Sequence, residues 1–221
     1  MLFYEQFADD FDSAVNMYDT QKRILVVFDE LLAKENIKNK KLLDVGCGTG
    51  WFSAVAVERG ARVTSMDIGK NLLKQVAKKC DSERVVGSIL DMPFKNDQFD
   101  YIISSEVIEH VSHPDKALRE LYRVLKPGGT LVLTTPNRFW YFALLIGNFF
   151  KLRPYQGFEN WYWYEELRAK LEQTGFTIRE MYGIHAFPFI FPALNPVLDR
   201  LHSFRRLLAP VMVNMAVRCQ K

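Results

Sequence analysis

Several features that would define a protein class at once are absent from this chain of 221 residues. It has no block of lysines and arginines, and its net charge is only +3, so its composition does not support nucleic-acid binding. Its three cysteines, Cys47, Cys80 and Cys219, lie far apart and form no C-x-x-C pair. They argue against a disulfide framework or a zinc site and indicate a reducing compartment.

Long apolar segments are also missing. The longest runs, 139–150 and 186–198, are shorter than the roughly 20 residues that a membrane-spanning helix needs. The opening residues "MLFYEQFADDFD" contain acids and no basic segment, so we expect no signal peptide and a cytoplasmic protein. The segment "VLDRLHSFRRLL" mixes arginines with leucines. Contact with a membrane surface therefore stays open beside the simpler interpretation of a solvated helix face.

Helical and strand patterns alternate along most of the chain, whose 48% hydrophobic and 25% charged residues are typical of a globular protein. The alternation predicts an α/β fold with a Rossmann-like, mostly parallel sheet and helices on both faces. We expect one domain over 1–221, with a helical segment at 1–38 and cap insertions at 139–160 and 186–210. Strands are predicted at 41–46, 61–67, 84–91, 99–106, 130–136, 176–184 and 211–221, and further helices at 51–60, 70–79, 114–126 and 163–175.

The stretch "LLDVGCGTG" places Gly46, Gly48 and Gly50 between a predicted strand and a predicted helix. Such a turn lets backbone N–H groups and a helix N-terminus approach a polar ligand. The spacing is one residue shorter than the dinucleotide fingerprint, and no phosphate-binding GxxxxGK[ST] occurs. Asp44 just before the turn would repel a pyrophosphate and suit a cationic ligand. A tight turn without any ligand is the alternative.

Two more acids follow predicted strands. Asp67 ends the second strand, where it can accept hydrogen bonds from both hydroxyls of a ribose, although it could also cap the next helix. Asp91 ends the third predicted strand, where it could accept from an adenine amino group or be a simple loop acid. With Asp44, these positions describe a pocket for an adenosine that carries a positive charge instead of phosphates.

At this point residues 41–137 resemble the class I S-adenosylmethionine (SAM)-dependent methyltransferases. "LLDVGCGTG" resembles their first motif, "VTSMD" the second, "SILDMPF" the adenine segment, and "FDYIISSEVIEHV" with "ELYRVLKPGGTLVLTTPN" the segments that follow. The resemblance implies a seven-stranded sheet whose last strand is antiparallel. It also implies that Asp44 and the glycine turn hold the methionine end, Asp67 the ribose and 90–92 the adenine. The predicted cofactor-binding residues are Asp44, Gly46, Cys47, Gly48, Gly50, Asp67, Ile68, Leu90, Asp91, Met92 and Ser105.

Methyl transfer from a sulfonium is an in-line displacement, for which an enzyme mostly supplies alignment and exclusion of water. A hydroxyl acceptor also needs a base. Glu106, Glu109 and His110 lie just past the fourth predicted strand, at the edge where ligands bind in such sheets, and are the predicted catalytic residues. His110 titrates near neutral pH and could be the base, or it could be a structural histidine bonded to nearby backbone.

The same three residues have the composition of a divalent-metal site. A similar E-x-x-E-H occurs in ubiquinone-biosynthesis O-methyltransferases that use a divalent ion, but the string is also common in relatives without metal. We therefore predict no metal ligands. His113 and His185 are weaker candidates for a base, with a helix cap and a strand end as their alternatives.

The pattern is most similar to the small-molecule methyltransferases of ubiquinone and menaquinone biosynthesis. It implies a small, hydrophobic or aromatic acceptor, with O-methylation favoured. Aromatic residues are dense between 139 and 164, where they could line an acceptor pocket, pack in the core or form an interface. Two other functions stay open: a NAD(P)-type oxidoreductase, and a SAM-binding protein without catalysis.

Overall fold

The computed structural model describes residues 12, 16–143, 145, 159–186 and 204–221. The start of the predicted 1–38 helical segment and most of the two predicted cap insertions lie outside these residues. Among the described residues, no helix is both long enough and apolar enough to cross a bilayer.

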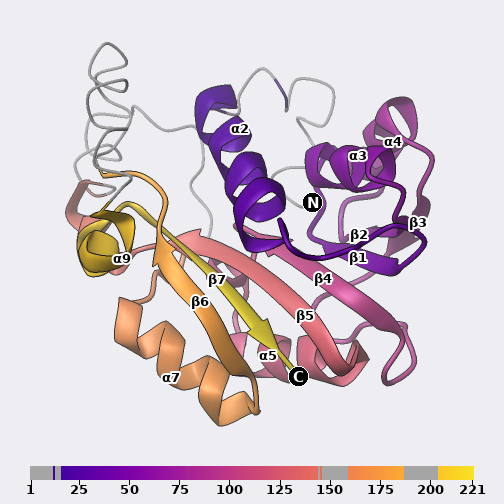
Figure 1. The fold of residues 1–221 in the computed structure, drawn as a ribbon. Helices are drawn as coiled ribbons and strands as arrows, with labels where there is room; N and C mark the ends of the chain where they lie inside the picture. Colours follow the sequence, from indigo (N-terminus) through magenta and orange to yellow (C-terminus); the bar gives the residue numbers. More distant parts are fainter. Residues whose placement is uncertain (1–11, 13–15, 144, 146–158, 187–203) are drawn as a thin grey trace.

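A seven-stranded sheet with the order β3-β2-β1-β4-β5-β7-β6 forms the centre of the molecule (Figure 1). The first five strands run parallel to their neighbours, and β7 pairs antiparallel with both β5 and β6. The predicted mixed sheet with an antiparallel last strand is therefore confirmed. The strands are β1 Lys41–Val45, β2 Arg62–Asp67, β3 Glu83–Val86, β4 Phe99–Ser105, β5 Leu125–Pro136, β6 Thr177–Gly183 and β7 Asn214–Gln220.

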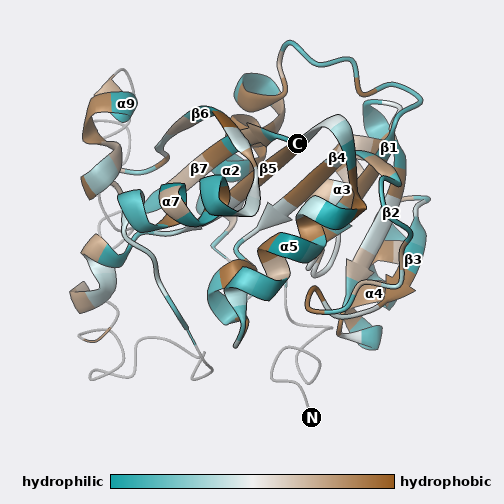
Figure 2. Cartoon of the chain, turned by 90° about the horizontal axis from the view of Figure 1, so that it is seen from below, coloured by the Kyte–Doolittle hydropathy of each residue, from teal (hydrophilic) through white to brown (hydrophobic). Residues whose placement is uncertain are grey.

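Helices cover both faces of the sheet, as expected from the sequence. In Figure 1, α2, α3 and α4 lie on one side, and α5 and α7 on the other; Figure 2 views the second side. The helix α2 continues directly into a π-helical turn, η2. The helices are α2 Met17–Leu25, η2 Val26–Leu31, α3 Trp51–Glu58, α4 Lys70–Lys79, α5 Pro114–Val124, α7 Tyr164–Thr174 and α9 Arg205–Leu208, with 3₁₀ turns η3 Ile108–His110, η4 Arg138–Trp140 and η7 Ala209–Val211.

The core lies between these helices and the sheet. Helix α5 shows how the sequence produces it, because Ala117, Leu118 and Leu121 recur at helical spacing and are fully buried on one face. Pro114 begins this helix, where its missing N–H costs no hydrogen bond. In Figure 2 the hydrophilic side of α5 faces outward and hydrophobic strands lie behind it.

The third strand is shorter than predicted. The strand β3 ends at Val86, although the N–H of Gly87 still donates to the carbonyl of Asp67. The chain then turns at 89–90, and Ser88 and Asp91 pair with each other across this turn in an isolated bridge. The prediction that Asp91 ends this strand is therefore wrong.

Two leucines with opposite burial test this packing. Leu118 is fully buried under the sheet, whereas Leu207 is 78% exposed. We expect Leu118→Ala to lower the free energy of unfolding by about 2–5 kcal/mol, because it removes apolar contacts and leaves a cavity. Leu207→Ala is the matched control and should change it by less than about 0.5 kcal/mol. Urea unfolding followed by circular dichroism measures both, and equal losses would contradict the packing described here.

Candidate active site

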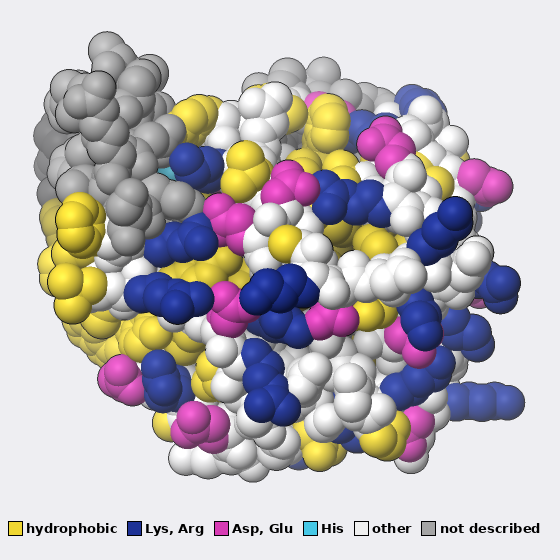
Figure 3. Space-filling model, in the orientation of Figure 1, with side chains coloured by type: hydrophobic (Ala, Val, Ile, Leu, Met, Phe, Trp, Pro, Cys, Tyr) yellow, Lys and Arg dark blue, Asp and Glu magenta, His cyan; other side chains and the backbone are white. Residues whose placement is uncertain are grey.

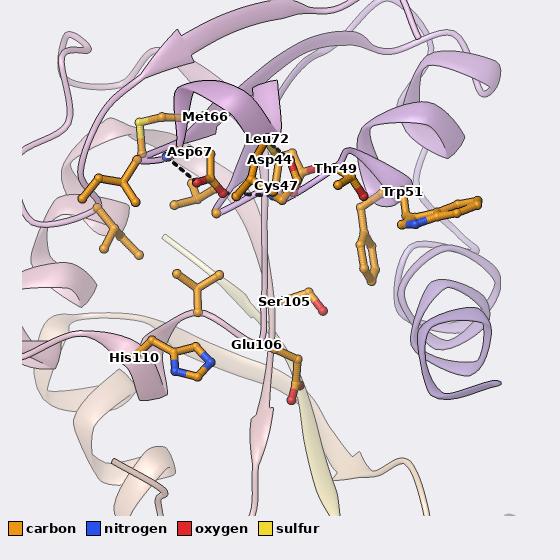
Figure 4. A pocket seen from close by; sticks show the side chains of 18 of the residues that line it. Asp44, Cys47, Thr49, Trp51, Met66, Asp67, Leu72, Ser105, Glu106 and His110 are labelled. Atoms are coloured by element: carbon orange, nitrogen blue, oxygen red, sulfur yellow. Dashed lines mark hydrogen bonds between the residues drawn. The ribbon is translucent and has the colours of Figure 1, made fainter. Parts of the chain in front are cut away.

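A cavity of about 420 Å³ opens at the carboxyl ends of β1, β2 and β4. The glycine turn, the end of β2 and the first turns of α3 and α4 line one side of it, while residues that follow β4 and residues of α2 line the other. In Figure 4, Asp44 and Asp67 lie across the cavity from Glu106 and His110. The sequence therefore brings its two groups of predicted residues to one cavity.

The glycine turn comes close to its neighbours. Gly46, Gly48 and Gly50 all have positive φ, which side chains rarely tolerate. A Cβ on Gly46 would lie 2.5 Å from Val107 Cγ2, so only glycine fits between the turn and the chain that follows β4. The N–H groups of Gly46 and Cys47 donate to the carbonyl of Met66 at 2.8 and 3.1 Å, which fixes the turn on β2.

Asp67 is held by backbone N–H groups from both sides. Its Oδ2 accepts from the N–H of Gly48 at 3.0 Å and its Oδ1 from the N–H of Gly69 at 2.8 Å. Gly69 occupies the N-cap position of α4, so Asp67 is not the N-cap residue that the alternative interpretation supposed. Each carboxylate oxygen can accept more than one hydrogen bond, so this carboxylate can also receive a ligand's hydroxyls.

Asp44 is buried and lines the cavity beside the turn. Burial, which disfavours the charged form, and the negative charge of Asp67 together raise the pKa of Asp44 to about 7, although Ser53 opposes this by donating a hydrogen bond at 2.6 Å. The carboxyl group is thus close to half-ionised at neutral pH. A cation placed beside it would favour the charged form.

Glu106 stands opposite, in a conformation that is uncommon for its residue type. Its φ of +57° is positive, a feature that concentrates at functional sites. Thr134 donates to its Oε1 and Asn214 to its Oε2, both at 2.9 Å. Burial raises the pKa of Glu106, whereas the positive charge of Arg23 opposes that rise.

Glu109 lies behind the cavity and does not line it, unlike Glu106 and His110. It is 1% exposed, and its Oε2 accepts from Thr135 Oγ1 at 3.1 Å. Burial and the charge of Glu106 hold its pKa well above the ordinary value. Its Oε1 is 4.0 Å from His110 Nε2, and its charge also acts on Arg23. No group of metal-binding side chains occurs among the described residues.

The predicted adenine segment is displaced from the cavity. Leu90, Asp91 and Met92 are not part of its lining, and 87–89 take this place. Asp91 is exposed, and the N–H of Met92 donates to Glu120 at 2.8 Å. Cys47, Ile68 and Ser105 line the cavity, and their contact with the cofactor stays a prediction.

The minor histidine candidates make other contacts. His113 holds the N-cap position of α5, but its side chain makes no capping hydrogen bond. His185 is 4% exposed, is not part of the cavity lining, and lies with its Nε2 3.0 Å from Asp19 Oδ1. No described aromatic residue of 139–164 lines the cavity either. Phe149, Phe150, Tyr155 and Phe158 lie outside the described residues.

Sequence reasoning missed the contribution of α2. Thr20 and Arg23 both line the cavity, and Arg23 Nη1 donates to Ser105 Oγ at 3.0 Å. The signal was an acid and a base four residues apart, Asp19 and Arg23, on a helix that continues into an apolar run. That spacing is common on exposed helices, so the sequence alone does not show that Arg23 lies at the cavity.

Comparisons with known proteins identify the class. Residues 43–133 match the family described as a methyltransferase domain. The ubiquinone biosynthesis O-methyltransferase of Pseudomonas fluorescens is 31% identical over 164 residues, which cover 67% of this chain and 69% of that protein. The chain belongs to the class I SAM-dependent methyltransferases.

Solved structures show the same fold at low sequence identity. A SAM-dependent methyltransferase of Thermotoga maritima superposes with a TM-score of 0.67 at 19% identity, covering 99% of this chain and 98% of that one. The [4+2]-cyclase SpnF has a TM-score of 0.64 at 19% identity, covering 90% of this chain and 80% of its own. These likenesses establish the fold. The reaction has to be inferred from the residues of the site.

The cavity fits the cofactor of this class, SAM, whose methyl group is activated by the sulfonium to which it is bonded. Asp67 presents a carboxylate that two backbone N–H groups hold in place, and the glycine turn lines the cavity beside it. Asp44 adds a carboxylate suited to positive charge. The chain therefore supplies acceptors for the polar groups of the cofactor without a phosphate-binding element.

The ionisation of Asp44 makes cofactor binding depend on pH. Its pKa is raised to about 7, so its carboxyl group becomes ionised as the pH rises through neutrality. The positively charged cofactor prefers the ionised form, and we expect its affinity to rise by up to about tenfold from about pH 6 to pH 8. Isothermal titration calorimetry measures this. Asp44→Asn should bind more weakly at the upper pH and lose the dependence; an equally steep profile in that variant would contradict the assignment.

Proposed function

We propose that this methyltransferase transfers the methyl group of SAM to a hydroxyl of a small lipophilic acceptor, with Glu106 and His110 at the acceptor end of the cavity. One observation carries the proposal: both residues line the same cavity as the glycine turn and Asp67. The relative in Pseudomonas fluorescens is named an O-methyltransferase of ubiquinone biosynthesis, which supports this choice of acceptor.

In this proposal the two halves of the cavity have different tasks. Asp44, Gly46 and Asp67 hold the methionine and ribose ends of the cofactor, and 87–89 border the adenine. Glu106 receives the acceptor's hydroxyl, because its carboxylate is fixed by Thr134 and Asn214 and faces the cavity.

The proton of the hydroxyl needs a destination as the methyl group is transferred. Glu106 and the half-buried imidazole of His110 line the acceptor side of the cavity, and either side chain can accept a proton. Glu109 lies behind His110.

The family assignment removes the basis for the alternative of a NAD(P)-type oxidoreductase. A SAM-binding protein without methyl transfer stays the second candidate, because the [4+2]-cyclase SpnF has the same fold.

Methyl transfer is tested directly with radiolabelled SAM and a panel of lipophilic phenols and catechols. With an acceptor that is turned over, we expect Glu106→Gln or His110→Ala, whichever removes the base, to lower kcat by about 10²–10⁴-fold. Glu165→Gln is the control, because that side chain is 76% exposed and lies on α7. If both site variants kept kcat within about tenfold of the unsubstituted enzyme, neither side chain would be the base.

A lipophilic acceptor would be delivered most easily from a membrane surface, and one edge of the molecule suits such contact. Exposed apolar side chains gather on η4, η7 and α9, and Trp140 Nε1 donates to the carbonyl of Val211 at 2.8 Å, which joins η4 to η7. Figure 3 shows hydrophobic side chains along the edge that carries α9. We call this the apolar rim; it consists of Phe139, Phe142, Leu145, Phe204, Leu207 and Val211.

The stretches of sequence that contain the apolar rim are basic, and two of their arginines, Arg205 and Arg206, pair with Glu30 and Glu180. The segments 137–158 and 200–213 contain no aspartate or glutamate, and their six basic residues are Arg138, Lys151, Arg153, Arg200, Arg205 and Arg206. Apolar side chains flanked by cations are the composition of a surface that binds anionic lipid.

Vesicle binding tests this contact. We expect the protein to cosediment with vesicles that contain phosphatidylserine, more weakly with pure phosphatidylcholine and less at high salt. Phe142→Ser with Leu207→Ser should weaken binding by about tenfold or more, because less apolar area enters the interface. Val86→Ser is the matched control, since Val86 is also exposed but lies on β3 at the opposite end of the sheet. Equal binding by the double variant would contradict a role for the apolar rim.

A further inference from the structure

Arg23 of α2 is built into the wall of the cavity. Its side chain is only 9% exposed. Nε donates to Asp19 Oδ2 at 3.0 Å, Nη1 to Ser105 Oγ at 3.0 Å and Nη2 to Thr20 Oγ1 at 3.4 Å. Each of the three guanidinium nitrogens thus donates a hydrogen bond. Arg23 also lines the cavity, together with Ser105.

A chain of hydrogen bonds connects this guanidinium to Glu106. Ser105 Oγ lies 2.8 Å from Thr134 Oγ1, which in turn donates to Glu106 Oε1 at 2.9 Å. Ser105 and Thr134 stand on neighbouring strands in register, so the parallel pairing of β4 with β5 holds the two hydroxyls together. Arg23 is therefore placed to fix the side-chain position of Glu106 through two hydroxyl groups.

The charges that face Glu106 come from several elements. Asp19 and Arg23 lie on α2, Glu109 and His110 on η3, and His185 follows β6 with its Nε2 on Asp19. Of these, Arg23 is the charge that favours the ionised form of Glu106, whereas Asp19 disfavours it. Asp19 bonds directly to the guanidinium, and Glu106 and Glu109 act on it through charge. Loss of that cation would leave the three carboxyl groups mutually repelling.

We propose that Arg23 is a positioning residue for the acceptor: through Ser105 and Thr134 it holds the carboxyl group of Glu106 in place, and its positive charge favours the ionised form, so that the acceptor end of the cavity selects molecules that donate a hydrogen bond. This inference rests on the proposed function, in which Glu106 receives the acceptor. It adds to that function a residue of α2, a helix that lies outside the family match at 43–133. It also limits the acceptor to neutral or cationic groups with an O–H or N–H, because Glu106 would repel the carboxylate of an acidic acceptor.

The test measures the pKa of Glu106 and needs no known acceptor. Protein labelled with ¹³C at the glutamate carboxyl carbon is titrated by NMR, and Glu106→Gln identifies the signal by deleting it. The variants are Arg23→Met, Arg23→Lys, which keeps the charge, and Asp19→Asn with Arg23→Met, which removes both members of the buried pair. Arg59→Met is the matched control, because Arg59 pairs with Asp29 on the surface away from the cavity.

We expect the pKa of Glu106 to be clearly higher in Arg23→Met than in the unsubstituted protein, and nearly restored in Arg23→Lys. Arg59→Met should leave it unchanged. If Arg23→Met does not fold, the double variant decides: its Glu106 should titrate at higher pH than in Asp19→Asn alone, which keeps the guanidinium. An unchanged Glu106 pKa in the folded variants would overturn the inference.

Binding of S-adenosylhomocysteine, the product formed from the cofactor, shows whether a negative result counts against the role of Arg23 or against the proposed function. Of the predicted cofactor-binding residues, Ser105 bonds to Arg23, whereas no bond described above joins Arg23 to Asp44, Asp67 or the glycine turn, so binding should persist in all variants, within about tenfold of the unsubstituted protein. No binding even by the unsubstituted protein would remove the proposed function itself. Normal binding with an unaltered Glu106 titration would remove only the role of Arg23.

Discussion

The parallel pairing of β1 with β4 is the constraint on which the site depends. The sheet runs outward from this pair in both directions, to β2 and β3 on one side and to β5 on the other, so the connections diverge and leave a crevice at the carboxyl ends. In register, Val45 lies opposite Ser104. The glycine turn and the chain at Glu106 are therefore neighbours. The wall formed by the turn and the wall that contains Glu106 meet where Gly46 closely approaches Val107.

The two sides stabilise their carboxylates in different ways. Asp67 receives two backbone N–H groups, which are fixed by the fold and carry no titration of their own. Glu106 depends on side chains from β5, β7 and, through charge, α2, and it adopts a strained backbone conformation. Strain and buried charge of this kind persist where the surrounding structure over-determines them, and they concentrate at functional sites. The wall of the cavity at Glu106 thus depends on interactions from distant parts of the chain.

Much of this arrangement could be predicted from the sequence, because its signals are local. The alternation of strands and helices gave the sheet, and the spacing of Gly46, Gly48 and Gly50 located the turn. The end of β3 was misplaced because the apolar pattern of "RVVGSILD" includes Ile89 and Leu90, where the chain already turns. The contact of Arg23 with Ser105 joins residues 82 positions apart, and no local pattern encodes it. The family resemblance did not help there, since α2 precedes the matched region.

The measurement that tests the central claim most directly is thermal unfolding with saturating S-adenosylhomocysteine, beside a parallel scan with NAD. A ligand at about 100 times its Kd stabilises the folded state by roughly 2.7 kcal/mol, which for a domain of this size raises Tm by about 5–10 °C. We expect that rise with S-adenosylhomocysteine, a much smaller one in Asp67→Ala, and none with NAD. No rise with S-adenosylhomocysteine, or a rise with NAD alone, would show that the cavity at the glycine turn holds a different ligand.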